Sequence, residues 1–142
     1  MADGSLARFL SRGSNQLLWL RVGLFLAGVN GAMAIMGLAI GFHGGAINPD
    51  WVLINIEQAA QMQMIHALAI LALAALVREF NCACMGIIML IFMIGILGFC
   101  GGLYAAGFYH EDFGVKIAPY GGAAFIIGWL WIAVMGLRRA RV

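Results

Sequence analysis

Four long runs of apolar residues follow one another along the chain, and short polar segments separate them. Each run is about 20 residues long, the length at which an α-helix crosses the ~30 Å hydrocarbon core of a bilayer. The runs are continuous, whereas the strands of a membrane barrel alternate apolar and polar residues over about 10 positions. The pattern therefore predicts four membrane-spanning helices, at Val22–Phe42, Ala59–Val77, Met85–Gly107 and Ala118–Leu137.

The composition supports the same class of protein. Hydrophobic residues make up 64% of the chain and charged residues 10%, whereas about 25% of the residues of a soluble domain are charged. So few charges cannot cover a surface that faces water. We therefore expect an all-α integral membrane protein, a four-helix bundle surrounded by the lipid bilayer. The net charge of +2 is too small to indicate a nucleic-acid partner.

The basic residues are distributed unevenly about the expected spans. Seven of the eight fall on one side of the membrane, and only Lys116 falls on the other. The seven are Arg8, Arg12, Arg21, Arg78, Arg138, Arg139 and Arg141. Positive charge is retained on the cytoplasmic side of membrane proteins. This distribution predicts that both termini lie in the cytoplasm, or in the matrix if the protein is mitochondrial.

The N-terminal segment, residues 1–16, differs from the spans. Leu6, Phe9 and Leu10 recur at helical spacing opposite arginines, which is typical of a mitochondrial presequence and also of an interfacial amphipathic helix. We divide the chain into this segment, a four-span membrane domain at 17–137 and a basic tail at 138–142. We expect the mitochondrial inner membrane as its location, with the bacterial cytoplasmic membrane as the alternative.

The second apolar run has a polar entry that extends from Glu57 to His66. Asn48 and Pro49 are residues that start helices, so we expect this helix to run from about Pro49 to Val77, with Glu57 near the lipid headgroups. Polar side chains in hydrocarbon need partners. Together with the histidine that closes the first run, the entry supplies a candidate polar hub on the outer side: His43, Gln58, Gln61, Gln63 and His66.

The polar hub has two interpretations. Glutamine and histidine often hydrogen-bond between membrane helices, each bond contributing about 0.6–2 kcal/mol, and this is the interpretation that we favour. The alternative is a vestibule that handles protons or binds a ligand. Two histidines can ligate haem or a metal, but no third or fourth ligand is evident inside the membrane and His66 has no matching histidine deep in another span. We therefore expect no cofactor and no metal.

The other candidate residues favour packing over chemistry. Met85, Met89 and Met93 recur at i+4, a pattern more typical of packing than of copper binding. Cys100 lies too far along one helix from Cys82 and Cys84 for the three to bind one ion. The inner side is reducing, so we expect free thiols and no disulfide. No nucleophile, phosphate-loop or zinc-protease motif is present, so we expect no enzyme.

Glycines recur at spacings typical of close contact between membrane helices, where small residues let the backbones approach. We expect seven of them to lie at helix–helix contacts: Gly37, Gly41, Gly45, Gly98, Gly102, Gly121 and Gly122.

Several motifs together resemble a known family. They are Gly-Phe-His-Gly at 41–44, Gln-Met-Ile-His-Ala-Leu-Ala at 63–69, Gly-Gly-Leu-Tyr at 101–104, Ile-Ala-Pro-Tyr-Gly-Gly at 117–122 and Gly-Trp at 128–129. This order is similar to that of the transmembrane protein 256-like family, also called the domain-of-unknown-function 423 family. The resemblance covers about residues 27–137, and the chain departs from the family pattern at Phe42, at its cysteines and in its methionine-rich third span. It implies a four-span fold and no agreed activity.

Small size, short loops and the absence of catalytic motifs favour a non-catalytic accessory subunit of a larger membrane complex, whose partners are other membrane protein subunits. The presequence-like segment points to a respiratory complex of the mitochondrial inner membrane. The alternative function is a small oligomeric transporter or a proton-coupled binder that uses the outer Gln/His cluster.

Overall fold

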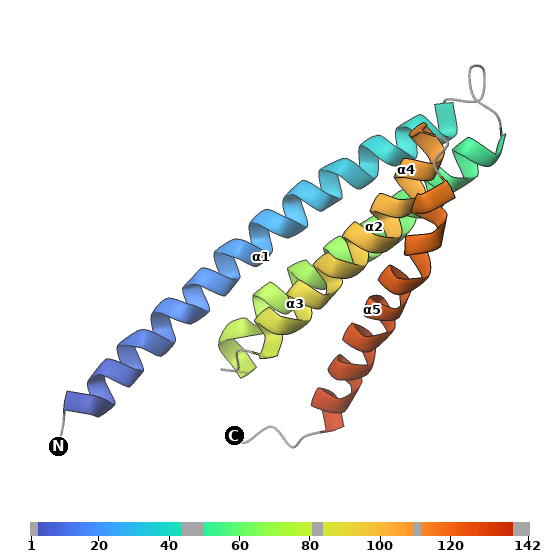
Figure 1. The fold of residues 1–142 in the computed structure, drawn as a ribbon. Helices are drawn as coiled ribbons and strands as arrows, with labels where there is room; N and C mark the ends of the chain where they lie inside the picture. The colour runs from blue at the N-terminus through green and yellow to red at the C-terminus, as the bar shows by residue number, and fades with distance from the viewer. Residues whose placement is uncertain (1–2, 44–49, 81–83, 110–111, 138–142) are drawn as a thin grey trace.

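The computed structural model describes residues 3–43, 50–80, 84–109 and 112–137, and all of them are helical. Its elements are α1 (Asp3–His43), α2 (Asp50–Phe80), α3 (Cys84–Gly95), η2 (Ile96–Cys100), α4 (Gly101–Tyr109) and α5 (Asp112–Leu137). Figure 1 shows them as long rods that run side by side, with the start of α1 and the end of α5 at the same end of the bundle.

Among the residues that the structure describes, four helical segments are long and apolar enough to cross a membrane: Asn15–His43, Asp50–Val77, Cys84–Tyr109 and Phe113–Leu137. The prediction of an all-α, four-span protein is confirmed. The helices extend beyond the apolar runs because residues at the membrane interface continue them. The second begins at Asp50, whose carboxylate is favourable at the positive end of a helix. The first runs through Gln16 without a break.

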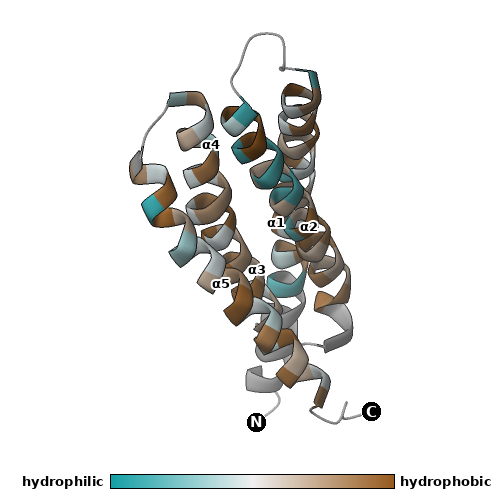
Figure 2. Cartoon of the chain, turned by 90° about the vertical axis from the view of Figure 1, so that its right-hand side faces the viewer, coloured by the Kyte–Doolittle hydropathy of each residue, from teal (hydrophilic) through white to brown (hydrophobic). Residues whose placement is uncertain are grey.

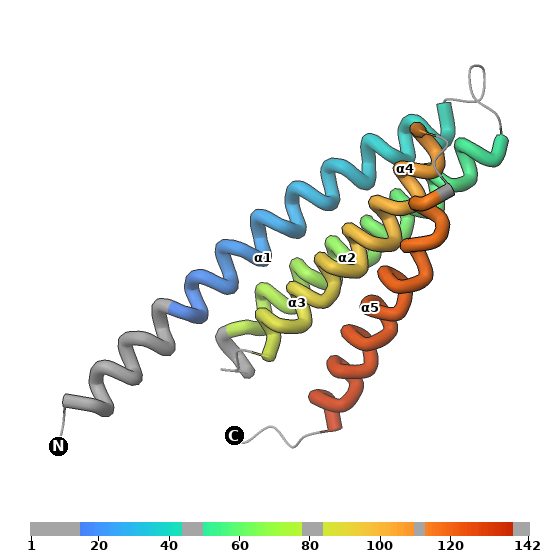
Figure 3. Tube along the Cα trace, viewed as in Figure 1, coloured from blue at the N-terminus to red at the C-terminus, as the bar shows by residue number. Residues whose placement is uncertain are grey.

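The third span consists of α3, η2 and α4 in one continuous rod (Figure 3). Its middle, η2, is a π-helix of five residues, in which the N–H of Gly101 donates to the carbonyl of Ile96, five residues back. A π-segment holds an extra residue in one turn, and such segments are frequent at functional sites. Hydrophobic periodicity gives no signal for it, so the sequence did not predict it.

The helices do not close into a symmetrical bundle. The first helix packs mainly on α2, and α5 packs on α3, η2 and α4. Within the described residues, no Cα atom of α2 lies within 8 Å of one in α5. Only 17% of the most apolar stretch of α5 is buried, against 50% for α2. The second and last helices therefore flank the third span with a space between them that side chains must fill.

Glycines lie where helices approach most closely. A Cβ atom on Gly98 would lie 3.0 Å from the Cα of Gly121, and one on Gly102 would collide with the backbone of Gly114. In α1, a Cβ atom on Gly37 would collide with the hydroxyl of Tyr104, and one on Gly41 would collide with the side chain of Glu57. In α5, a Cβ atom on Gly122 would make only an ordinary contact with Phe99. Gly45 lies outside the described residues. The glycines of η2, α4 and α5 thus permit direct backbone packing between the third span and α5.

Candidate functional site

Gln63 lies near the midpoint of the second span and is 2% exposed. Both ends of its side-chain amide are paired. Its Nε2 donates to Oδ1 of Asn30 in α1 over 2.9 Å, and its Oε1 accepts from the hydroxyl of Tyr104 in α4, also over 2.9 Å. Asn30 donates in turn to the carbonyl of Leu26 over 2.8 Å. One chain of hydrogen bonds therefore links three of the four spans.

These hydrogen bonds offset the free-energy cost of burying polar side chains within a membrane span. Asn30 is 5% exposed, and its Nδ2 also lies 3.5 Å from the sulfur of Met93 in α3. Hydrophilic positions interrupt the otherwise hydrophobic bundle along α1 and α2 (Figure 2). Within the described part of the chain, no buried side-chain nitrogen or oxygen lacks a partner. Every buried polar side-chain atom of the network thus has a partner within the protein.

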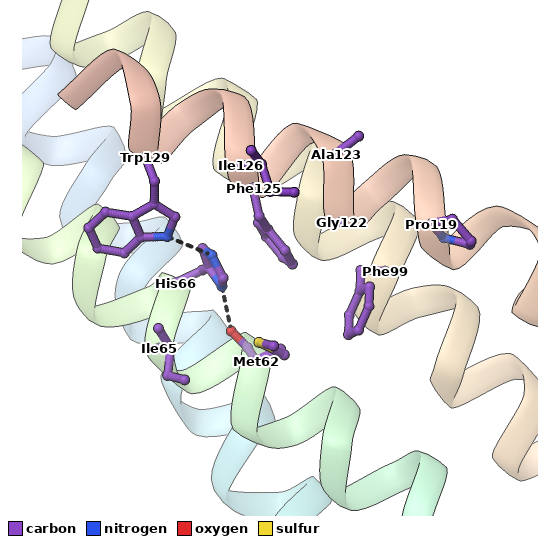
Figure 4. Close-up of a pocket in the computed structure, with 10 residues that line it drawn as sticks. All are labelled: Met62, Ile65, His66, Phe99, Pro119, Gly122, Ala123, Phe125, Ile126 and Trp129. Carbon is purple, nitrogen blue, oxygen red and sulfur yellow. Dashed lines mark hydrogen bonds between the residues drawn. The ribbon is translucent and has the colours of Figure 1, made fainter. Parts of the chain in front are cut away.

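His66 follows one turn after Gln63 and belongs to a different environment. It is 3% exposed, and its two ring nitrogens have different partners, both drawn in Figure 4. Nδ1 lies 2.8 Å from the carbonyl oxygen of Met62, and Nε2 lies 3.2 Å from Nε1 of Trp129 in α5. A carbonyl only accepts and an indole N–H only donates. These partners therefore assign a neutral ring with its proton on Nδ1.

Aromatic rings surround the His66 side chain. Its ring stacks on Phe125 of α5 with centroids 3.5 Å apart and an angle of 12°. Phe92 of α3 meets it edge-on at 5.2 Å. Because the backbones of α2 and α5 stay apart, the contacts of His66 with Phe125 and Trp129 connect these two helices. The imidazole is therefore held rigidly, and only its Nε2 faces a side chain that is partly exposed.

A cavity of about 580 Å³ lies beside His66, between α2 and α5. Phe99 of η2 lines the cavity between these two helices. Met62, Ile65 and Ile126 also line it, and their side chains are exposed on the outside of the chain. Exposed residues within membrane spans face lipid, so the cavity opens sideways into the bilayer. Among the described residues that line it, only His66 and Trp129 carry a side-chain N–H or aromatic ring nitrogen. Its size and mostly apolar lining are typical of small-molecule sites.

The structure separates the members of the predicted polar hub. Gln63 and His66 are buried in two distinct sites near the middle of α2, whereas Gln58 and Gln61 are exposed. His43 is exposed at the end of α1, while His66 lies sixteen residues beyond Asp50, about 24 Å along the helix. Gln63 and His66 therefore do not share a site with the other three residues.

Three residues outside the hub complete the two sites: Asn30, Tyr104 and Trp129. For each of the three, the sequence contained a feature that could have drawn attention to it. Asn30 is the only polar residue within Val22–Phe42, and Tyr104 and Trp129 belong to the motifs that carry the family resemblance. Helical-wheel reasoning on one helix could not connect them, because their partners come from other spans.

The cysteines differ from one another. Cys100 is a free thiol and fully buried, as expected. Cys84 is disulfide-bonded, so the expectation of a free thiol there, which rested on a reducing inner side, is wrong. Among the described residues, no three His, Cys, Asp or Glu side chains gather in a group that could hold a metal ion.

Comparison with known proteins gives one family. The model of a protein family of unknown function, DUF423, matches residues 36–122. A UPF0382 membrane protein of Haemophilus influenzae is 36% identical over 104 residues, which cover 72% of this chain and 77% of the relative. The UPF0382 membrane protein YwdK of Bacillus subtilis is 31% identical over 125 residues, covering 84% of this chain and 98% of the relative. No solved structure matches the chain.

Proposed function

We propose that this chain, which belongs to the DUF423 family of proteins of unknown function, is a non-enzymatic membrane protein that binds a small lipophilic ligand between α2 and α5. The observation that carries the proposal is the cavity of about 580 Å³ with the His66–Trp129 pair in its lining. The apolar walls favour a ligand that is dissolved in the bilayer. The His66–Trp129 pair, of which only His66 is buried, offers the one directional contact by which such a ligand could be recognised.

The chemistry of the lining supports binding rather than catalysis. No described residue that lines the cavity has a carboxylate, thiol or hydroxyl side chain, and both ring nitrogens of His66 are already engaged. A general acid or base needs a group that can exchange a proton with the substrate. A nucleophile needs an adjacent base. The described residues of the lining supply neither a free general acid or base nor a nucleophile with an adjacent base.

The matched relatives are bacterial membrane proteins, which favours the bacterial cytoplasmic membrane over the mitochondrial inner membrane as the location. The arginines before the first span and after the last one in the sequence support cytoplasmic termini. Nothing in the relatives' names points to a respiratory complex.

A role as an accessory subunit is the second candidate. It is favoured by the open face of α1, where a Cβ atom on Gly28 or Gly31 would meet nothing within 4 Å. Glycines that are open in this way allow a partner helix to approach closely. Migration with a large complex after extraction in mild detergent supports this role, and migration as a small species argues against it.

Quenching of tryptophan fluorescence tests the ligand-binding proposal. One variant retains only Trp129, by replacement of the other three tryptophans with phenylalanine, and a matched variant retains only Trp131, which does not line the cavity. Both are placed in lipid nanodiscs, and a brominated alkylbenzene is added. We expect Trp129 to be quenched saturably at a low mole fraction of the probe. Trp131 should be quenched in proportion to the probe in the bulk lipid.

A second pair of variants assigns the quenching to the cavity. Gly122 lines it and Gly136 lies on the same helix with nothing within 4 Å. In the background that retains Trp129, Gly122→Leu should remove saturable quenching and Gly136→Leu should not. Equal, non-saturable quenching of Trp129 and Trp131 would overturn the proposal.

A further inference from the structure

The two nitrogens that face each other at the cavity set a strict requirement on any polar group that enters between them. The Nδ1 proton of His66 is committed to the carbonyl of Met62, so Nε2 can only accept a hydrogen bond. Nε1 of Trp129 can only donate one. The direct bond between them is 3.2 Å long, at the upper end of the range for a nitrogen donor. An entering group must therefore donate to one nitrogen and accept from the other.

We propose that the ligand is a lipid-soluble phenol, a class that includes hydroquinones, whose hydroxyl replaces the direct contact between His66 and Trp129. This inference rests on the proposed function and names its ligand class. A hydroxyl oxygen donates its proton to Nε2 of His66 and accepts the N–H of Trp129 with one atom. A ketone, an ether or an ester only accepts, so it would leave Nε2 unpaired in an apolar site, which is costly.

The walls of the cavity favour an aromatic ring beside that hydroxyl. Phe99 and Phe125 both line it, and their ring centroids are 5.9 Å apart at an angle of 58°. Figure 4 shows both rings in the space between α2 and α5, on the same side of His66. Aromatic rings prefer tilted or offset contacts at such separations. A flat ring can make them on entry, and an aliphatic alcohol cannot.

The two partners differ in their freedom to move, which makes insertion feasible. His66 is fixed by Met62 and by stacking on Phe125. Trp129 is 45% exposed, and it lies on α5, whose backbone does not pack on that of α2. The indole can therefore turn outward by a change of rotamer while the imidazole stays in place. His66 is the fixed acceptor and Trp129 the movable donor of the proposed site.

A matched pair of ligands tests the inference. Decylphenol and its methyl ether, decylanisole, differ in the single hydrogen that His66 would accept. Each competes with the brominated alkylbenzene for the nanodisc-embedded variant that retains only Trp129. We expect decylphenol to relieve quenching at a bilayer mole fraction about tenfold lower than decylanisole, the effect of one hydrogen bond. In a His66→Phe variant of the same background, this preference should disappear while the probe still binds saturably.

The outcomes separate this inference from the function on which it rests. Saturable probe binding with equal competition by the phenol and its ether overturns the inference and leaves the lipophilic site standing. A preference for the phenol that persists in His66→Phe also overturns it, because another group would then recognise the hydroxyl. Absence of saturable probe binding overturns the proposed function itself. Retained probe binding in His66→Phe also shows that the variant is folded.

Discussion

The hydroxyl of Tyr104 donates to the side-chain oxygen of Gln63 over 2.9 Å, and the same hydroxyl lies directly above Gly37. A Cβ atom on Gly37 would come within 2.6 Å of it. A residue of the third span therefore reaches across α2 to touch the backbone of α1. The absence of a side chain at one position permits a hydrogen bond between two others.

Loss of this hydroxyl should destabilise the fold. We expect Tyr104→Phe to lower the free energy of unfolding by about 1 kcal/mol, because Oε1 of Gln63 is left buried without a donor. Tyr120→Phe, at a tyrosine that is 78% exposed, is the matched control and should have no effect. Equilibrium unfolding in mixed micelles of a mild detergent and dodecyl sulfate measures both. Equal stability of the two variants would mean that the bond contributes nothing.

A methyl group at Gly37 should also weaken the hydrogen bond between Tyr104 and Gln63, because it would collide with the Tyr104 hydroxyl. Gly37→Ala must displace the Tyr104 hydroxyl, so we expect a loss of about 1–3 kcal/mol, the usual cost of overpacking. Gly31→Ala, on the same helix with open space around it, should be neutral or stabilise the helix by up to about 1 kcal/mol. The same unfolding measurement applies. A combined Gly37→Ala and Tyr104→Phe variant should lose less than the sum of the two.

Two adjacent glycines in α5 should respond very differently to the same change. A Cβ on Gly121 would collide with the backbone nitrogen of Phe99, whereas one on Gly122 would be 3.6 Å from the ring of Phe99. Backbone cannot rotate away as a side chain can, so Gly121→Ala should cost about 2–3 kcal/mol by forcing the helices apart. Gly122→Ala should be close to neutral. A reversed order of stability would contradict the close packing of α5 on the third span.

The assigned tautomer of His66 can be observed directly. In protein labelled with ¹⁵N-histidine, we expect the His66 signals of a neutral ring with its proton on Nδ1. Trp129→Phe removes the donor to Nε2, so the Nε2 resonance should shift, while Trp131→Phe should leave it unchanged. An unprotonated Nδ1 would be incompatible with the bond to the Met62 carbonyl.

The spans could be predicted from the sequence because their length and apolarity are set by the thickness of the bilayer, which varies by only a few ångströms between membranes. The partners of Gln63 and His66 could not. Those partners lie on other helices, and their choice depends on crossing geometry that no periodicity encodes. Gln61 and Gln63 look alike in the sequence, yet one faces outward and the other is 2% exposed.

The π-segment η2 is a second reason why the relative orientation of side chains along the third span could not be predicted from the sequence. It places one extra residue within a turn between Ile96 and Cys100, and this offsets the faces of α3 and α4 by about 100° relative to one ideal helix. A helical wheel drawn through the whole third span would therefore misplace Tyr104 relative to Met93. Only the structure shows that both reach the same network, through Gln63 and Asn30.

The cavity between α2 and α5 opens to the outside of the helices at Met62, Ile65 and Ile126. In a bilayer, hydrocarbon would complete it. A ligand would then reach His66 by diffusion in the plane of the membrane and would never cross an aqueous mouth. Its occupancy would follow its concentration per lipid, so an apparent affinity expressed per volume of water would change with the amount of membrane present. For such a site, the oil–water partition coefficient of a compound contributes to the selectivity of binding. A compound that stays in water would not reach the site.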